Sequence, residues 1–134
     1  MTHPSLALQK AIVAALIGDS AVGALIGDRI WDAPPRDATF PYLTIGQVNT
    51  TDWSTGSEDG AEHQLTLHAW SRERGKRECY AIAAAVEATL HDAALTLQDH
   101  ALVNLRFEFA ETRRDPDGIT YHCAIRFRAV TEPT

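Results

Sequence analysis

The sequence predicts an α+β fold, in which an antiparallel sheet of four to five strands carries two main helices on one face. Helical spacing of apolar residues occurs near the start and again in the middle, whereas apolar and polar residues alternate in the segments between and after. The predicted order is helix, short helix, three strands, helix and two strands. At 134 residues the chain is expected to form a single domain over residues 1–134, with a flexible arm at about 51–61.

The two main helices are predicted from apolar residues that recur every three to four positions. The first covers about residues 5–17, where the hydroxyl of Ser5 can cap the first amide groups. A short second helix is expected just before Gly27, because glycine readily takes the positive φ that ends a helix. The other main helix covers about residues 76–92 and has one apolar stripe.

The first three strands lie between these helices. A short strand is predicted at 29–31, followed by a loop whose prolines lack the N–H groups that a sheet needs. Alternating residues then predict strands at about 41–50 and 62–71, with Leu65 and Leu67 on the apolar face.

Residues 51–61 separate the second and third strands and are rich in Ser, Thr and Gly. They carry Asp52, Glu58 and Asp59 without a basic residue, and they also contain Trp53. The segment is too long for a tight hairpin turn, so it is expected to form a flexible arm.

Residues 101–129 predict an antiparallel hairpin around the turn Asp115-Pro116-Asp117-Gly118. Alternation places one row of residues on the apolar face, namely Val103, Leu105, Phe107 and Phe109 in one strand, with Ile119, Tyr121, Cys123, Ile125 and Phe127 in the other. The opposite face is predicted to stay polar and to bear Arg106, Arg126 and Arg128.

The composition excludes several classes of function. The net charge of −6 is opposite in sign to that of most proteins whose main ligand is nucleic acid. No apolar run approaches the roughly 20 residues needed to cross a bilayer, so no membrane partner is expected. Two cysteines are too few for a disulfide scaffold, which fits a reducing cytoplasm.

No metal, cofactor or catalytic site is predicted. His63 and His68 differ by five positions on one strand and therefore point to opposite faces. His68 and His122 share the polar face and can approach across strands, but no third ligand is evident. Cys123 belongs to the apolar row and faces away from His122, and no nucleotide-binding or hydrolase motif occurs.

A basic cluster at the start of the helix near residue 76 is either a solvated turn or a contact patch. Its charge is opposite to that of the 51–61 arm, which suits a repeating head-to-tail contact between copies of the chain. The candidate interface residues come from the arm, from this cluster and from the polar sheet face: Asp52, Trp53, Glu58, Asp59, Arg72, Arg74, Arg77, Arg106, Arg126 and Arg128.

Six strings in a fixed order carry a resemblance that covers nearly the whole chain: Arg29-Ile30-Trp31-Asp32, Pro41–Gly46, Leu65–Ser71, Leu105–Glu108, Arg114–His122 and Ile125–Ala129. This order resembles the tail-completion proteins of long-tailed phages and gene transfer agents, also described as tail terminators or tail-to-head joining proteins. The resemblance implies a sheet with helices on one face and no catalysis.

The same resemblance implies a hexameric ring that caps the head-proximal end of the tail tube, stops its polymerisation and joins it to the head. The implied partners are further copies of the chain, the tail tube protein and the head-tail connector or stopper protein, with DNA only as cargo passing through the channel. The implied location is the head-tail junction of a virion or virion-like particle, assembled in the bacterial host cytoplasm. The alternatives are a head-side connector component or a small ligand-binding or enzymatic domain, and the source can be a phage, a prophage or a gene transfer agent.

Overall fold

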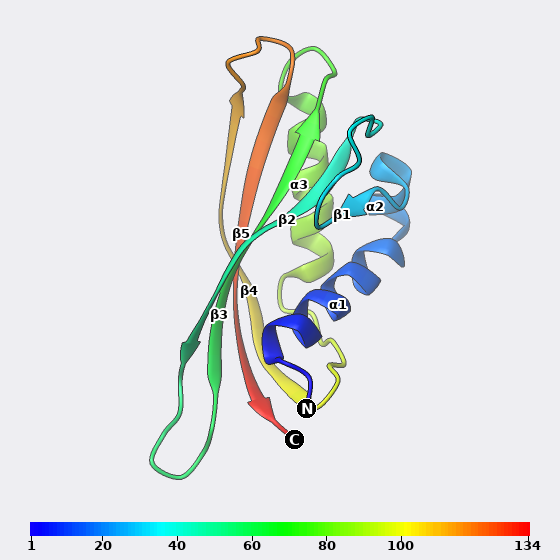
Figure 1. Ribbon diagram of the computed structural model, residues 1–134. Coiled ribbons are helices and arrows are strands. Elements are labelled where there is room, and N and C mark those ends of the chain that lie inside the picture. The colour runs from blue at the N-terminus through cyan, green and yellow to red at the C-terminus, as the bar shows by residue number, and fades with distance from the viewer.

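The computed structural model describes residues 1–134 and has a layer of helices packed on one face of a five-stranded sheet (Figure 1). The sheet order is β1-β2-β3-β5-β4. The elements are α1 Pro4–Ile17, α2 Ser20–Ile26, β1 Ile30–Trp31, β2 Tyr42–Asp52, β3 Ala61–Ser71, α3 Arg77–Leu90, β4 His100–Arg114 and β5 Tyr121–Pro133. The predicted α+β class and element order are confirmed. The sheet is mixed, because β1 pairs with β2 in parallel whereas the other pairs are antiparallel.

The hydrophobic core lies between the helices and one face of the sheet. In α1, Leu8, Ile12 and Leu16 are buried at intervals of four residues, which is the spacing of one helical face. In β5, alternate residues from Cys123 to Phe127 are fully buried beneath the helices. No single helix is long and apolar enough to cross a membrane, and α1 and α2 reach that length and apolarity only as a pair bent by 83°.

The two cysteines are structural residues of this core. Cys79 of α3 and Cys123 of β5 are both buried as free thiols. Burial raises the pKa of the Cys79 thiol to about 12, with smaller contributions from Cys123 and nearby carboxylates. A thiol with such a pKa is protonated at neutral pH and is a poor nucleophile.

The first helix begins differently from the prediction. The N-cap is His3, whose imidazole Nδ1 accepts a hydrogen bond from the Ser5 amide at 3.1 Å, and Pro4 occupies the first turn. The Ser5 hydroxyl does not cap the helix. It instead hydrogen-bonds to Thr50 of β2 and, at 2.9 Å, to Nδ1 of His63 in β3.

The predicted apolar row of β4 is wrong at both ends. Register shifts occur between Leu102 and Asn104 and between Phe107 and Phe109, where β4 contains an extra residue relative to β5. Each bulge moves the following side chains to the other face. Val103, the extra residue of the first bulge, is 49% exposed, and Phe109, which follows the second bulge, is 40% exposed, whereas Leu105 between the bulges is fully buried.

The predicted apolar row of the last strand is also wrong at its start. Ile119 is 57% exposed because it lies in the turn before β5, which begins at Tyr121. The rest of that row, from Cys123 to Phe127, faces the core as predicted.

The connection between β2 and β3 is shorter than the predicted arm. β2 continues to Asp52 and β3 begins at Ala61, so residues 53–60 connect them. The connection folds back on itself through two backbone hydrogen bonds. The amide of Trp53 donates to the carbonyl of Gly60 at 2.9 Å, and the amide of Thr55 donates to the carbonyl of Glu58 at 2.8 Å. Its flexibility remains a prediction. We call residues 52–60 the arm tip.

Gly46 allows the polar face of the sheet to pack closely. β2 shifts register against β3 between Ile45 and Val48, and Gly46 lies in this irregular segment. A Cβ atom at position 46 would lie 2.6 Å from Cδ2 of His68 and 2.8 Å from the carbonyl oxygen of Thr66. No other residue type fits there without moving the imidazole and the backbone of β3.

His63 is a fully buried polar side chain that ties α1 to the sheet. Its Nδ1 lies 2.9 Å from the hydroxyl of Ser5, and its Nε2 lies 2.9 Å from the hydroxyl of Thr131 in β5. Burial lowers the pKa of His63 to about 4, and His3 and His100 contribute in the same direction. The folded protein therefore keeps this imidazole neutral where an unfolded chain would protonate it.

We expect Gly46→Ala to destabilise the fold by about 1–3 kcal/mol, because the added methyl group overpacks against His68 and Thr66. The matched control is Gly23→Ala in α2, where an added Cβ meets nothing within 4 Å and alanine favours the helix. Urea unfolding of both variants measures the effect. Equal stability of the two variants would contradict the close packing at Gly46.

We expect the free energy of unfolding to fall as the pH drops from about 6.5 to about 4, because only the unfolded chain protonates His63 in this range. The pKa difference corresponds to about 3 kcal/mol at most. Urea unfolding at several pH values measures this slope. His63→Gln should reduce the slope. An unchanged slope in His63→Gln would count against the buried neutral imidazole.

Candidate assembly interfaces

Seven of the ten candidate interface residues lie at two opposite ends of the sheet. The eleven residues of β3 separate these ends by about 33 Å, at 3.3 Å per step. The arm tip continues from one end of β3, whereas the start of α3 and the β4–β5 turn lie at the other end (Figure 1). The 14-residue helices reach only about 21 Å. The arm tip therefore projects beyond the helical layer, as Figure 1 shows at the bottom of the view.

The arm tip forms an acidic end. Asp52, Glu58 and Asp59 are exposed, and none of them forms an ion pair within the chain. Trp53 is 51% exposed on the same segment. The four residues that the sequence placed on the arm therefore share one accessible surface.

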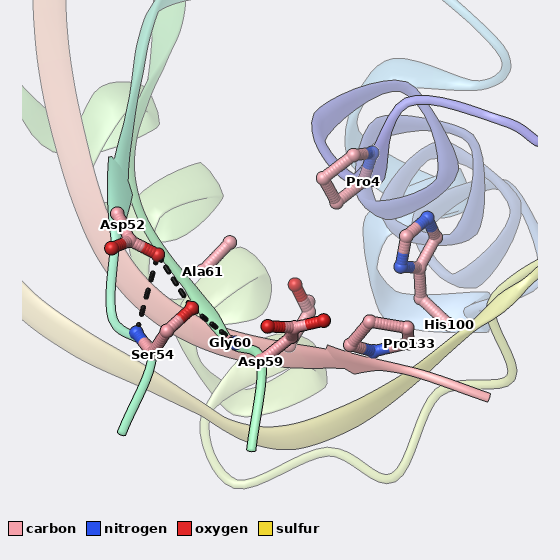
Figure 2. A pocket seen from close by; sticks show the side chains of 9 residues that line it. Pro4, Asp52, Ser54, Asp59, Gly60, Ala61, His100 and Pro133 are labelled. Atoms are coloured by element: carbon pink, nitrogen blue, oxygen red, sulfur yellow. Dashed lines mark hydrogen bonds between the residues drawn. The ribbon is translucent and has the colours of Figure 1, made fainter. Parts of the chain in front are cut away.

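The base of the arm tip borders a groove that also involves α1, β4 and β5 (Figure 2). The Asp52 carboxylate accepts a hydrogen bond of 2.6 Å from the Ser54 hydroxyl, which in turn accepts one of 3.3 Å from the Gly60 amide. Figure 2 shows the side chain of Asp59 on the groove side of the arm, near Pro133. These bonds hold the start of the connection against its end.

The start of α3 forms a basic end. Arg72, Arg74 and Arg77 are all exposed, and the last two have no hydrogen bond or ion pair through their side chains. Arg72 donates to the Thr120 hydroxyl at 3.1 Å, and its guanidinium lies 4.3 Å from the ring centre of Phe40.

Two further arginines belong to the basic end, and the sequence prediction did not include them. Arg113 and Arg114 close β4 and, with Lys76, Gly75 and Tyr121, line a hollow of about 440 Å³. The sequence signal is the pair of arginines directly before the Asp115–Gly118 turn, but only strand pairing brings it beside α3. We define the basic end by its six cations: Arg72, Arg74, Lys76, Arg77, Arg113 and Arg114.

The three arginines predicted on the polar sheet face are engaged within the chain. Arg128 donates to the Glu62 carboxylate at 2.9 and 2.6 Å, and its guanidinium lies 6.0 Å from the ring centre of Trp53. Arg126 lies 4.8 Å over the ring of Phe109, the side chain that the bulge turns to this face.

Arg106 lies 3.5 Å from the Asp92 carboxylate after α3, so it too has a partner within the chain. Of the three arginines, only Arg128 therefore lies beside a charged end, next to Trp53 of the arm tip.

An aromatic cluster occupies the centre of the polar face. Nδ1 of His68 lies 2.6 Å from Nε2 of His122, so the predicted approach of these histidines across strands is confirmed. The Trp70 ring stacks on His122 with ring centres 4.2 Å apart and donates a hydrogen bond to the Thr44 hydroxyl. Burial lowers the pKa of both histidines. No third His, Cys, Asp or Glu joins them in a metal-binding arrangement.

Comparison with known proteins gives consistent matches over nearly the whole chain. The family model described as "Tail completion protein gp17" matches residues 10–132. The tail completion protein gp17 of Bacillus phage SPP1 is 27% identical over 124 residues, which cover 92% of this chain and 91% of that protein.

Solved structures extend this similarity to the fold. A chain in the virion of a native gene transfer agent particle is 31% identical, with a TM-score of 0.91 over 98% of this chain and 99% of that chain. The structure of the bacteriophage SPP1 gp17 protein is 25% identical, with a TM-score of 0.63 over 93% of this chain and 88% of that chain.

These matches confirm the resemblance carried by the strings between Arg29 and Ala129. They run through the arm tip, both ends of the sheet and all three helices. The chain belongs to the tail completion protein family, whose members are structural components of virions and not enzymes.

Proposed function

We propose that this protein assembles as a ring on the head-proximal end of the tail tube, where it stops polymerisation and forms the joint to the head connector. The similarity to a virion chain of a gene transfer agent, at a TM-score of 0.91 over 98% of this chain, is the observation that carries the proposal. A hexamer is the stoichiometry that the family resemblance implies. Its partners are the tail tube protein on one side and the connector or stopper protein on the other.

The separation of charge along the sheet supports assembly into a ring. A contact that uses two different patches of one chain leaves an unsatisfied patch at each end of an open chain of subunits, and ring closure removes both. The acidic and basic ends are such a pair of patches, because they are about 33 Å apart on one rigid sheet.

Termination follows from covering the growing surface. A ring seated on the last layer of tube subunits occupies the surface to which the next subunit would add. The net charge of −6 suits a ring through which DNA passes as cargo, because an acidic protein offers few cations to hold the phosphates. Assembly then takes place in the bacterial host cytoplasm, and the finished ring remains at the head-tail junction.

We expect tail tubes polymerised with the purified protein to be shorter and to carry a ring at one end. Electron microscopy of tubes grown with and without the protein measures this, with the mass of the free protein determined alongside. Tubes of unchanged length without a ring would contradict termination. If the protein binds isolated heads and not tubes, it is a head-side connector component, which is the alternative function that the sequence left open.

A further inference from the structure

We propose that neighbouring subunits are joined by the arm tip of one copy, seated in the basic end of the next. The partner that fits this surface is therefore a second copy of the same chain. This inference rests on the proposed ring and names the side chains that close it.

The two surfaces have opposite charge. Segments 72–78 and 113–118 together carry six Lys or Arg and four Asp or Glu, a net charge of +2. The arm tip, residues 52–60, carries three acidic residues and no basic one, a net charge of −3. An intermolecular contact would neutralise charges that the free chain leaves in solvent.

Two of the four carboxylates in the basic end are already hydrogen-bonded within the chain. Glu78 accepts a hydrogen bond of 2.6 Å from the Ser71 hydroxyl. Asp117 accepts hydrogen bonds from the Thr120 hydroxyl and from the amides of Ile119 and Thr120, which hold the β4–β5 turn. None of the six cations forms an ion pair within the chain.

The N-terminus of α3 adds a second preference for an acidic occupant. The N-cap residue is Lys76, and no side chain caps the first turn of this 14-residue helix. The first amide groups of a helix lack partners within it and carry the positive end of its dipole. Lys76 also lines the hollow with Arg113 and Arg114, so a carboxylate entering there meets three cations beside the start of the helix.

Apolar surface is exposed on both sides of the proposed contact. The arm tip presents Trp53, which is 51% exposed. The basic end presents Ile119, which is 57% exposed and borders a hollow with Tyr121, Arg72 and Arg74. An indole can bury against such aliphatic and aromatic side chains and can stack on a guanidinium.

The contact is tested with two charge-reversed variants that are complementary to each other. Glu58→Lys with Asp59→Lys makes the arm tip basic, and Arg74→Glu with Arg114→Glu makes the basic end acidic. Each variant alone places like charges in every contact, so we expect about tenfold or greater loss of ring formation on tube ends. An equimolar mixture restores opposite charges in every contact of an alternating ring, and we expect it to recover capping.

Asp28→Lys with Asp37→Lys is the matched control for the arm-tip variant, because it makes the same change of charge on exposed residues that belong to neither surface. Circular dichroism of each variant checks folding, and capping is scored by electron microscopy. The inference is overturned if both reversed variants cap like the wild type. It is also overturned if the mixture fails to recover, because the arm tip then contacts the tube or the head connector. Failure of the wild-type protein itself to cap overturns the proposed function.

Discussion

The uninterrupted pairing of β3 with β5 is the constraint on which the rest of the structure depends. Eleven consecutive residues of β3, from Ala61 to Ser71, pair with β5 without a register shift. This uninterrupted central pair gives the helices a continuous apolar face, on which Phe127 and Leu67 are fully buried. It also sets the distance between the arm tip and the basic end, because both continue directly from the ends of β3. One ladder thus determines the core and the separation of the two charged surfaces.

The elements whose pattern reflects burial alone could be predicted from the sequence. β3 alternates strictly because one of its faces is buried, and α3 shows an apolar stripe because it packs on that face. The faces of β4 could not be predicted, because bulges near Val103 and Glu108 depend on its fit to β5. The parallel pairing of β1 with β2 could not be predicted either, because a strand of two residues carries no information on its direction.

The candidate interface was partly predictable for a related reason. Charge runs that are contiguous in sequence, such as the arm tip and Arg72–Arg77, could be recognised directly. Arg113 and Arg114 reach the basic end only through the hairpin that returns β4 beside α3, so their role needed the structure. Conversely, the sequence predicted Arg126 and Arg128 as interface residues, but within the chain Arg126 lies over Phe109 and Arg128 pairs with Glu62. Tertiary pairing therefore decides which charges remain without a partner inside the chain.

The most direct test of the account is a cryo-electron microscopy reconstruction of the head-tail junction from particles that contain this protein. We expect a closed ring of this chain between the tail tube and the head connector, with each arm tip against the start of α3 in the neighbouring subunit. A reconstruction that places the chain on the head side without touching the tube would contradict termination by this protein.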